Sequence, residues 1–435
     1  MIFPDEALEV LRRLEEAGYE AWFVGGAVRD RVLGREAADV DITTSATPSE
    51  IEAVFAGERT LDVGKSFGTI RVVMPRAVYE VTTYRAERNY IDGRHPETVE
   101  YSRHIEDDLK RRDFTMNAMA WHPERGLLDL YGGRQDLAAG LLRAVGVAAE
   151  RMEEDGLRML RAVRFASRFA MKLEPSLRKA IIDQHTQIER ISVERCYEEL
   201  ERMLTEGHPD RAVDLLAETG LWEALFPELP AANVSRPLLC AVADDAASRW
   251  AAVGSGNRTL RTREAEENTS AEREAGAKER AKRMTEILHR FKASTKRSSD
   301  VRLLLEARAE ALPQTLPEAR KWQGEHPKDT RRILQFLAEI SPVLYPEGAW
   351  RTKTLKRITH TSALIDIIEE SHLPVSIKDL AIRGEDLLAL GMKPGKRVGT
   401  MLLYLLDQVI EERLENTTSR LCEAARRKLE EGENG

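Results

Sequence analysis

The chain has 435 residues, of which 32% are charged and 6% are aromatic, and its formal net charge is −8. At roughly 100–200 residues per domain, this length predicts about two to four domains with real cores. The acidic balance argues against a protein that coats nucleic acid indiscriminately, but it is compatible with a local basic track.

The chain carries no predicted membrane or export signal. It has no run of about 18 apolar residues, and its N-terminus lacks the basic-then-apolar order of a signal peptide. The cysteines Cys196, Cys240 and Cys422 are far apart and have no histidine at ligand spacing, which argues against a disulfide framework or a zinc site. We interpret them as buried thiols and expect a cytoplasmic protein without membrane contact.

The first third of the chain alternates strand and helix patterns. Short β-branched or apolar segments bounded by turn residues predict strands in AWFVGG, DVDITT, TIRVVMP and VYEVTTYR. Helical periodicity ending on glycine predicts helices in ALEVLRRLEEAG, AVRDRVLG and SEIEAVFAG. This alternation predicts a small domain that combines a sheet with helices.

From about residue 150 onward the pattern becomes helical throughout. Apolar residues recur at i, i+3 and i+4 in segments such as DGLRMLRAVRFASRF and GTMLLYLLDQVIEERL. Residues 257–283 are polar and charged, with no apolar stripe before Met284, and the sequence assigns them no role. Basic clusters such as 351–357 and 393–397 are either solvated helix surface or a track for an RNA backbone.

Two aspartates flank a single valine in the segment DVDITT. Because side chains alternate along a strand, Asp39 and Asp41 at i and i+2 of the predicted strand would share one face. Two carboxylates on one face repel each other unless a cation lies between them, and Mg²⁺ prefers such oxygen ligands. The pattern therefore predicts a magnesium site, with a solvent-facing strand edge as the alternative.

A paired glycine precedes these aspartates. Gly25 and Gly26 follow the apolar strand AWFV and open a helix, so backbone N–H groups at the turn can bind an anion. Arg29, one turn into that helix, can add a charge-assisted contact to phosphate. A strand, a glycine pair, a helix and an aspartate pair follow one another within about twenty residues. This combination predicts a nucleoside triphosphate site beside a metal.

A third carboxylate would complete a two-metal centre. Glu80 lies in the middle of the predicted strand VYEVTTYR, which could neighbour the strand of the aspartates. Alternatively, Glu80 is a cross-strand ion-pair partner of Arg71 or Arg85.

Five ordered segments and a tail carry a family resemblance. FVGGAVRDRVLG with DVDI, KRRDFTMNAMA, LLDLYGGRQDLAAGLLRAVG, EEDGLRMLRAVRF, ISVERCYEELERML and the tail IRGEDLLALGMKPGKRVG follow one another in the chain. In this order they resemble the class II tRNA nucleotidyltransferases, the bacterial-type CCA-adding enzymes, whose relatives include bacterial poly(A) polymerases. The resemblance covers nearly the whole chain and is weakest from about residue 253 to 284.

The resemblance implies an α+β protein. A polymerase-beta-like nucleotidyltransferase head with a small mixed sheet would span residues 1–147. All-helical domains would follow as a neck at 148–206, a body at 207–330 and a tail at 331–435.

The resemblance also implies roles for single residues in the head. Asp39 and Asp41 would hold two Mg²⁺ ions, with Glu80 as a third catalytic carboxylate. Residues that bind the nucleotide would be Gly25, Gly26, Ala27 and Arg29 at the triphosphate, Arg112 and Asp113 at the sugar, and Asn117 in support of the same pocket.

The neck would read the nucleobase through the pattern E-D-x-x-R. Asp155 and Arg158 lie at i and i+3, which predicts that they share one helix face. Asp155 can accept from the exocyclic amine of cytosine or adenine, while Arg158 donates to the neighbouring ring nitrogen. Uracil and guanine would present a carbonyl to the carboxylate instead. The alternative is an ordinary intrahelical salt bridge; Arg161 and Arg164 on the same segment belong to the implied nucleotide-binding set.

These implications predict template-independent addition of CCA to the 3′ end of tRNA from CTP and ATP, with Mg²⁺ as cofactor. The helical domains would hold the acceptor stem and elbow of tRNA, and the oligomeric state stays open. The segment 85–107 is present at full length where relatives that add only CC carry a shorter loop. Enzymes that add only the final A retain this loop and are the nearest alternative, followed by a poly(A) polymerase and an inactive RNA-binding protein.

Overall fold

The structure is a computed structural model that describes residues 1–435 except 38, 65–67, 91–95, 257–269, 346 and 434–435. The chain forms two compact units, one of Met1–Arg236 with Ile287–Ala293 and one of Pro237–Glu286 with Ser294–Gly435. None of the helices in these described ranges has the length and apolarity that crossing a bilayer requires. The predicted boundaries at residues 147, 206 and 330 stay predictions.

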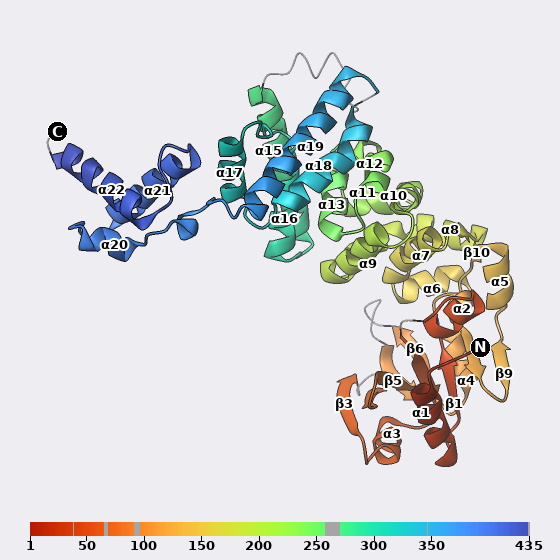
Figure 1. Ribbon diagram of the computed structural model, residues 1–435. Helices are drawn as coiled ribbons and strands as arrows, with labels where there is room; N and C mark the ends of the chain where they lie inside the picture. The colour runs from red at the N-terminus through yellow and green to blue at the C-terminus, as the bar shows by residue number, and fades with distance from the viewer. Residues whose placement is uncertain (38, 65–67, 91–95, 257–269, 346, 434–435) are drawn as a thin grey trace. The chain divides into compact units, whose positions relative to one another are not determined.

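A seven-stranded mixed sheet forms the centre of the N-terminal part of the first unit (Figure 1). Its strand order is β3-β4-β5-β2-β1-β8-β9, in which β2 and β5 pair in parallel and the other neighbours pair antiparallel. The strands are β1 (Ala21–Val24), β2 (Asp41–Thr44), β3 (Arg59–Gly64), β4 (Thr69–Val73), β5 (Val78–Thr83), β8 (Met119–His122) and β9 (Gly126–Asp129).

Alternating side chains bury both faces of this sheet. Phe23 and Ile42 pack into a core with the apolar stripe of α1, whereas Trp22 and Val24 pack on the other face with Leu109 of α4. The helices of this part are α1 (Asp5–Glu16), α2 (Gly26–Val32), α3 (Pro48–Val54), α4 (Ile105–Lys110) and α5 (Gly133–Ala139), with a 3-10 turn, η2 (Thr115–Asn117).

The segment predicted as a long loop contains regular structure. Residues 85–101 form a hairpin of β6 (Arg85–Tyr90) and β7 (Pro96–Tyr101), and α4 follows directly. Residues 91–95, between these two strands in the chain, lie outside the described residues. A short parallel pair, β10 (Leu141–Leu142) and β11 (Lys172–Leu173), adds a strand that the helical pattern after residue 150 did not predict.

Helices form the rest of the first unit. The buried stripe of α9 contains Cys196, Leu200 and Met203, whose spacing of four and three residues places them on one face. The elements are α6 (Ala148–Glu154), α7 (Leu157–Arg168), α8 (Pro175–Gln184), η3 (His185–Arg190), α9 (Val193–Thr205), α10 (Pro209–Glu218), α11 (Leu221–Leu225), η4 (Ala231–Asn233) and α12 (Arg236–Ala241), which begins at the end of this unit.

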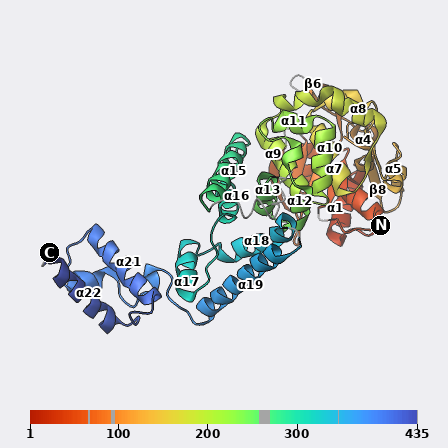
Figure 2. The same cartoon turned by 90° about the horizontal axis from the view of Figure 1, so that it is seen from above.

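The second unit is helical in its described residues. The long helices α18 and α19 lie side by side in both views (Figures 1 and 2), and a separate core around Leu387, Leu405 and Leu421 joins the last three helices. The helices are α13 (Ala246–Gly254), α15 (Ser270–Arg290), α16 (Thr295–Ala307), α17 (Leu316–Glu325), α18 (Thr330–Leu344), α19 (Ala349–Glu370), η5 (Ile377–Asp379), α20 (Gly384–Ala389), α21 (Lys396–Ile410) and α22 (Thr418–Glu433).

Two expectations from the sequence need correction here. Ala277 and Ala281 in α15 are buried, so the apolar stripe of this helix begins before Met284. Small alanines carry little hydrophobic signal, which explains why a charged composition concealed the buried face. Among the cysteines, Cys196 is buried and Cys422 is partly buried, but Cys240 is exposed.

Candidate active site

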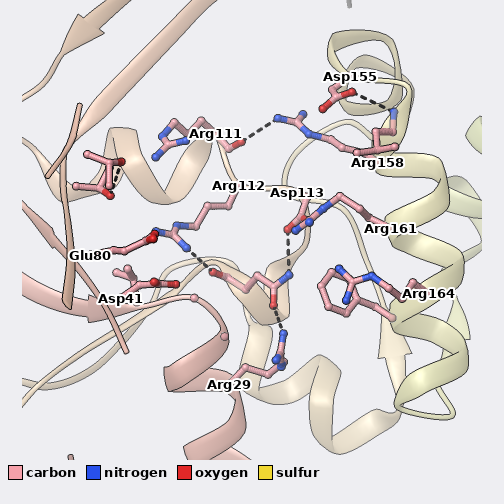
Figure 3. A pocket seen from close by; sticks show the side chains of 18 of the residues that line it. Arg29, Asp41, Glu80, Arg111, Arg112, Asp113, Asp155, Arg158, Arg161 and Arg164 are labelled. Carbon is pink, nitrogen blue, oxygen red and sulfur yellow. Dashed lines mark hydrogen bonds and ion pairs between the residues drawn. The ribbon is translucent and has the colours of Figure 1, made fainter. Parts of the chain in front are cut away.

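A cavity of about 620 Å³ in the first unit brings the predicted nucleotide-binding segments together (Figure 3). Its walls carry more positive than negative side chains, which suits a polyanionic ligand. The arginines that line it are Arg29, Arg85, Arg111, Arg112, Arg158, Arg161, Arg164, Arg168 and Arg195, and the carboxylates are Asp41, Glu80, Asp113 and Asp155.

Asp41 and Glu80 form the carboxylate pair at the sheet side of this cavity. They are register partners in the parallel pair of β2 and β5, and both line the cavity. Burial and then the charge of Glu80 raise the pKa of Asp41, while Arg112 opposes this rise. The pair therefore leaves negative charge that a cation would compensate.

Asp39 does not lie on the strand of Asp41, so the prediction that both aspartates share one strand is wrong. The strand β2 begins at Asp41, so Asp39 lies before it, is exposed, and does not line the cavity. Its negative charge still contributes to the raised pKa of Asp41, after the effects of burial and Glu80. The structure thus pairs Asp41 with Glu80 of the neighbouring strand, which alternation along a single strand could not identify.

The alternative considered for Glu80 is also present. Arg71 on β4 contacts Glu80 through Nε at 2.8 Å and Nη2 at 2.6 Å, and both contacts use Oε1. Each of the two side chains is about two-fifths exposed, at 41% and 43%. Glu80 therefore takes part in a cross-strand ion pair while it lines the cavity.

The glycine pair forms the turn that leads from β1 into the N-terminus of α2. Gly25 has φ 68°, a conformation that favours glycine, and precedes the helix that begins at Gly26. A Cβ atom at Gly25 would lie 2.8 Å from Nη1 of Arg112. Arg112 is held there by Oδ2 of Asp108 at 3.0 Å and the carbonyl oxygen of Asn117 at 3.3 Å. Only glycine at position 25 leaves the guanidinium of Arg112 in this place.

We expect Gly25→Ala to weaken CTP binding about tenfold, because displacing Arg112 removes one charge-assisted contact worth about 1.4 kcal/mol. Isothermal titration of the full chain with CTP measures this change. Gly18→Ala is the matched control: Gly18 also has a positive φ of 89°, but nothing lies within 4 Å of its Cβ position. Equal losses of affinity in both variants would show that backbone strain alone acts.

A chain of buried polar contacts connects α2 with α7. Arg29 donates from Nη1 to Oδ1 of Asn117 at 2.8 Å, and Asn117 donates from Nδ2 to Oδ1 of Asp113 at 3.1 Å. Oδ2 of Asp113 accepts from Nε of Arg161 at 2.8 Å. These contacts fix the predicted triphosphate residue Arg29 and the predicted sugar residue Asp113 relative to Arg161 of α7 (Figure 3). Ala27, by contrast, packs into the core and does not line the cavity.

The charge state of Asp113 makes this chain sensitive to acid. Burial would raise the pKa of Asp113, but Arg161 and the hydrogen bond from Asn117 together lower it from 3.8 to about 2. A lowered pKa in the folded state stabilises the fold above the unfolded value, and this stabilisation is lost as the pH falls towards the folded value.

We therefore expect Asp113 to contribute about 2 kcal/mol to the free energy of unfolding, with loss of this contribution between about pH 4 and pH 2. Urea unfolding across this range compares the chain with Asp113→Asn, whose free energy of unfolding should fall less steeply with acid. Parallel pH dependences in the two proteins would contradict this role of Asp113.

The residues predicted to read the base, Asp155 and Arg158, lie at a helix start rather than on one helix face. Asp155 has extended backbone angles between α6 and α7, and its Oδ1 accepts from the N–H of Leu157 at 3.0 Å. Gly156 separates it from α7, so the predicted common helix face of Asp155 and Arg158 is wrong. Asp155 instead satisfies a free N–H in the first turn of α7, a role that suits aspartate. Both residues nevertheless line the cavity.

The predicted alternative of a salt bridge between these two residues is also wrong. Arg158 pairs with Glu154, and its Nη2 donates to the carbonyl oxygen of Arg111 at 3.2 Å. Asp155 accepts at Oδ2 from Nη2 of Arg195 at 2.7 Å. Each side chain is thus held by a neighbour from another segment and remains at the cavity wall.

Several residues of this network were not singled out by the sequence analysis. Asp108 is fully buried and binds both Arg111 and Arg112, at the i+3 and i+4 positions that a helix brings together. Glu199 of α9 is buried and accepts from Nε of Arg164 at 2.6 Å. The sequence did contain a signal for Asp108 and Glu199, because each is a charged residue at a position of an amphipathic helix that faces the core. Across the described ranges, no three His, Cys, Asp or Glu side chains are grouped to hold a metal ion.

Comparisons with known proteins agree with this arrangement. Residues 21–143 match the family described as "Poly A polymerase head domain", and residues 170–232 match "Probable RNA and SrmB- binding site of polymerase A". Residues 277–425 match the family of tRNA nucleotidyltransferase domain 2.

Curated relatives match in part or throughout. The chain is 47% identical to the CCA-adding enzyme of Bacillus licheniformis over 220 residues, 51% of this chain and 55% of that enzyme, so the match spans about half the relative's length. It is 35% identical to the CCA-adding enzyme of Levilactobacillus brevis over 425 residues, which cover 96% of each chain.

Solved structures show the same fold. The CCA-adding enzyme of Bacillus stearothermophilus in complex with CTP is 31% identical, with a TM-score of 0.72 and full coverage of both chains. The Thermotoga maritima CCA-adding enzyme complexed with tRNA is 19% identical with a TM-score of 0.56, covering 98% of this chain and 96% of that one, and supports the fold alone. The predicted family and the predicted α+β fold are thereby confirmed, and this chain belongs to the class II CCA-adding enzymes with a poly(A) polymerase-type head.

Proposed function

We propose that this protein adds CCA to the 3′ end of tRNA without a nucleic-acid template, using CTP and ATP and releasing pyrophosphate. One observation carries the proposal: a single cavity is lined by the sheet carboxylates Asp41 and Glu80 and also by Asp155 and Arg158. The family membership and the relative whose structure contains CTP support it.

In this proposal the arginines of the cavity bind the triphosphate. Backbone N–H groups at Gly25 and Gly26 and the start of α2 provide an anion site, and Arg29 lies beside them. Arg29 is buried and rests over the ring of Phe169 at 4.7 Å, which holds its guanidinium in one orientation. Arg112 and Asp113 would flank the sugar, and Arg161 and Arg164 would complete the positive wall.

The residues present fit a divalent cation. Burial and the neighbouring charge of Glu80 raise the pKa of Asp41, so a cation beside this carboxylate would favour its charged form, and Mg²⁺ prefers such oxygen ligands. Asp41 and Glu80 would hold this ion, and the exposed Asp39 adds negative charge that acts on Asp41. When bound, Mg²⁺ supplies activation of the primer 3′-hydroxyl and shields the charge of the triphosphate.

The base is selected by two side chains. Asp155 would accept from the exocyclic amine of cytosine or adenine, and Arg158 would donate to the adjacent ring nitrogen. A carbonyl in place of the amine leaves two acceptors face to face, which costs several kcal/mol at a buried site. The same pair can therefore serve both C and A while it rejects U and G. The helical neck, body and tail would hold the acceptor stem and elbow of tRNA.

Three tRNA transcripts test this function: one ends at the discriminator base, one at the first C and one at CC. Each is offered CTP and ATP, separately and together, and the products are sequenced. We expect all three to be completed to CCA and extension to stop there. Extension of the CC transcript alone would identify an enzyme restricted to A, continued addition of A would identify a poly(A) polymerase, and no extension would contradict the proposal.

A further inference from the structure

Helix α9 presents two opposite charges to the nucleotide cavity from consecutive turns. Arg195 and Glu199 lie at i and i+4 and therefore on one face of the helix. Glu199 is buried and holds Arg164, and Arg195 lines the cavity. Helix α9 thus contacts two side chains of the cavity wall, Arg164 through Glu199 and Asp155 through Arg195.

Arg195 is the partner that fixes the base-reading carboxylate. Its Nη2 donates to Oδ2 of Asp155 at 2.7 Å, while Oδ1 of Asp155 accepts from the N–H of Leu157 at 3.0 Å. With one contact at each oxygen, the plane of the carboxylate cannot turn freely. An ionised carboxylate has about four lone-pair sites, so sites remain for the amine of a base.

One donor atom of Arg195 has no hydrogen-bond partner among the described residues. This atom, Nη1, is buried. Buried donors without partners are rare because their desolvation is not repaid.

We propose that Arg195 is a positioning residue that sets nucleotide selectivity by holding Asp155 in the orientation that accepts an amine. This inference rests on the proposed function. Without Arg195, the Asp155 side chain can rotate, and water can enter between it and the base. Because water both donates and accepts, a bridging water would satisfy the carbonyl of uracil as well as the amine of cytosine. Selectivity, rather than general activity, is therefore the quantity that depends on Arg195.

The test measures kcat/KM of the full chain for CTP, UTP, ATP and GTP on tRNA transcripts ending at C or CC. We expect Arg195→Ala to lower the preference for CTP over UTP by about tenfold to hundredfold, and the preference for ATP over GTP in the same direction. Arg195→Lys keeps the charge and should restore part of both preferences. Arg202→Ala is the matched control, because Arg202 is exposed on the same helix and does not line the cavity.

Thermal unfolding of each variant separates folding from selectivity. If Arg195→Ala does not fold, Arg195→Met keeps the length of the side chain and takes its place in the same assay. A variant that loses activity equally with all four nucleotides, with both preferences unchanged, would overturn the positioning role. Failure of the unsubstituted protein to add C or A to tRNA would instead contradict the proposed function itself, so the two failures are distinguishable.

Discussion

Asp41→Ala is expected to abolish nucleotide addition, with a fall in rate of at least about 10³-fold. The loss of a metal-binding carboxylate removes several kcal/mol of transition-state stabilisation, and about 4 kcal/mol corresponds to this factor. The same change should not destabilise the fold, since burial and Glu80 already disfavour the charged form of Asp41. Single-turnover extension of tRNA ending in CC measures the rate, and thermal unfolding measures the stability.

Asp62→Ala provides the matched control for this substitution. Asp62 is an exposed carboxylate on β3 of the same sheet and does not line the cavity. We expect this variant to retain activity, and both variants to retain measurable tRNA binding. Addition at an undiminished rate by Asp41→Ala would show that the cation is held elsewhere.

Asp155→Asn is expected to reduce discrimination between CTP and UTP by about 10²-fold to 10³-fold. An amide can turn its NH₂ group towards a carbonyl, whereas an ionised carboxylate only accepts, so the substitution removes the penalty against uracil. The guanidinium of Arg195, which would then face a neutral amide, should not restore the preference for CTP over UTP. Competition between the two nucleotides on one transcript, read by sequencing, measures the ratio.

Asp183→Asn is a suitable control for this change. Asp183 is an exposed residue of α8 that pairs with Lys179 and does not line the cavity. This variant should discriminate as the unsubstituted protein does. Unchanged discrimination in Asp155→Asn would remove Asp155 from the base-reading role and leave Arg158 to be tested alone.

Local patterns of sequence were sufficient for much of the head. Short β-branched or apolar segments bounded by turn residues predicted the strands around Phe23, Ile42 and Glu80, and the glycine pair predicted the turn into α2. These features depend on neighbours within a few residues, so propensity and periodicity determine them. The place of Gly25, Gly26 and Arg29 near one another at the cavity was predictable for the same reason.

The relations between segments were not predictable in this way. Asp39 was placed on a strand that begins only at Asp41, because a two-residue repeat does not reveal where a strand starts. Asp155 was predicted to lie on a helix, but it precedes α7 and is separated from it by Gly156. Its side chain instead accepts from the N–H of Leu157 in the first turn of α7. In both cases the predicted backbone setting was wrong; Asp155 nevertheless lines the cavity, whereas Asp39 does not.

The supporting charges were missed for a different reason. Arg195 and Glu199 acquire a role only when α9 packs behind the cavity, and sequence spacing gives no partner across 40 residues, the separation of Arg195 from Asp155. Charged residues on an amphipathic helix ordinarily face solvent, so the pattern favoured the wrong environment for Glu199. Three-dimensional packing, rather than composition, identifies such positioning residues.

The central claim is that one cavity holds the triphosphate with its cation at Asp41 and the nucleobase at Asp155. A crystal structure of the full chain with CTP and Mg²⁺ tests it most directly. The account predicts Mg²⁺ about 2.0–2.1 Å from an oxygen of Asp41, with the cytosine amine within hydrogen-bonding distance of Asp155. A cation bound away from Asp41, or a cytosine that does not contact Asp155, would contradict it.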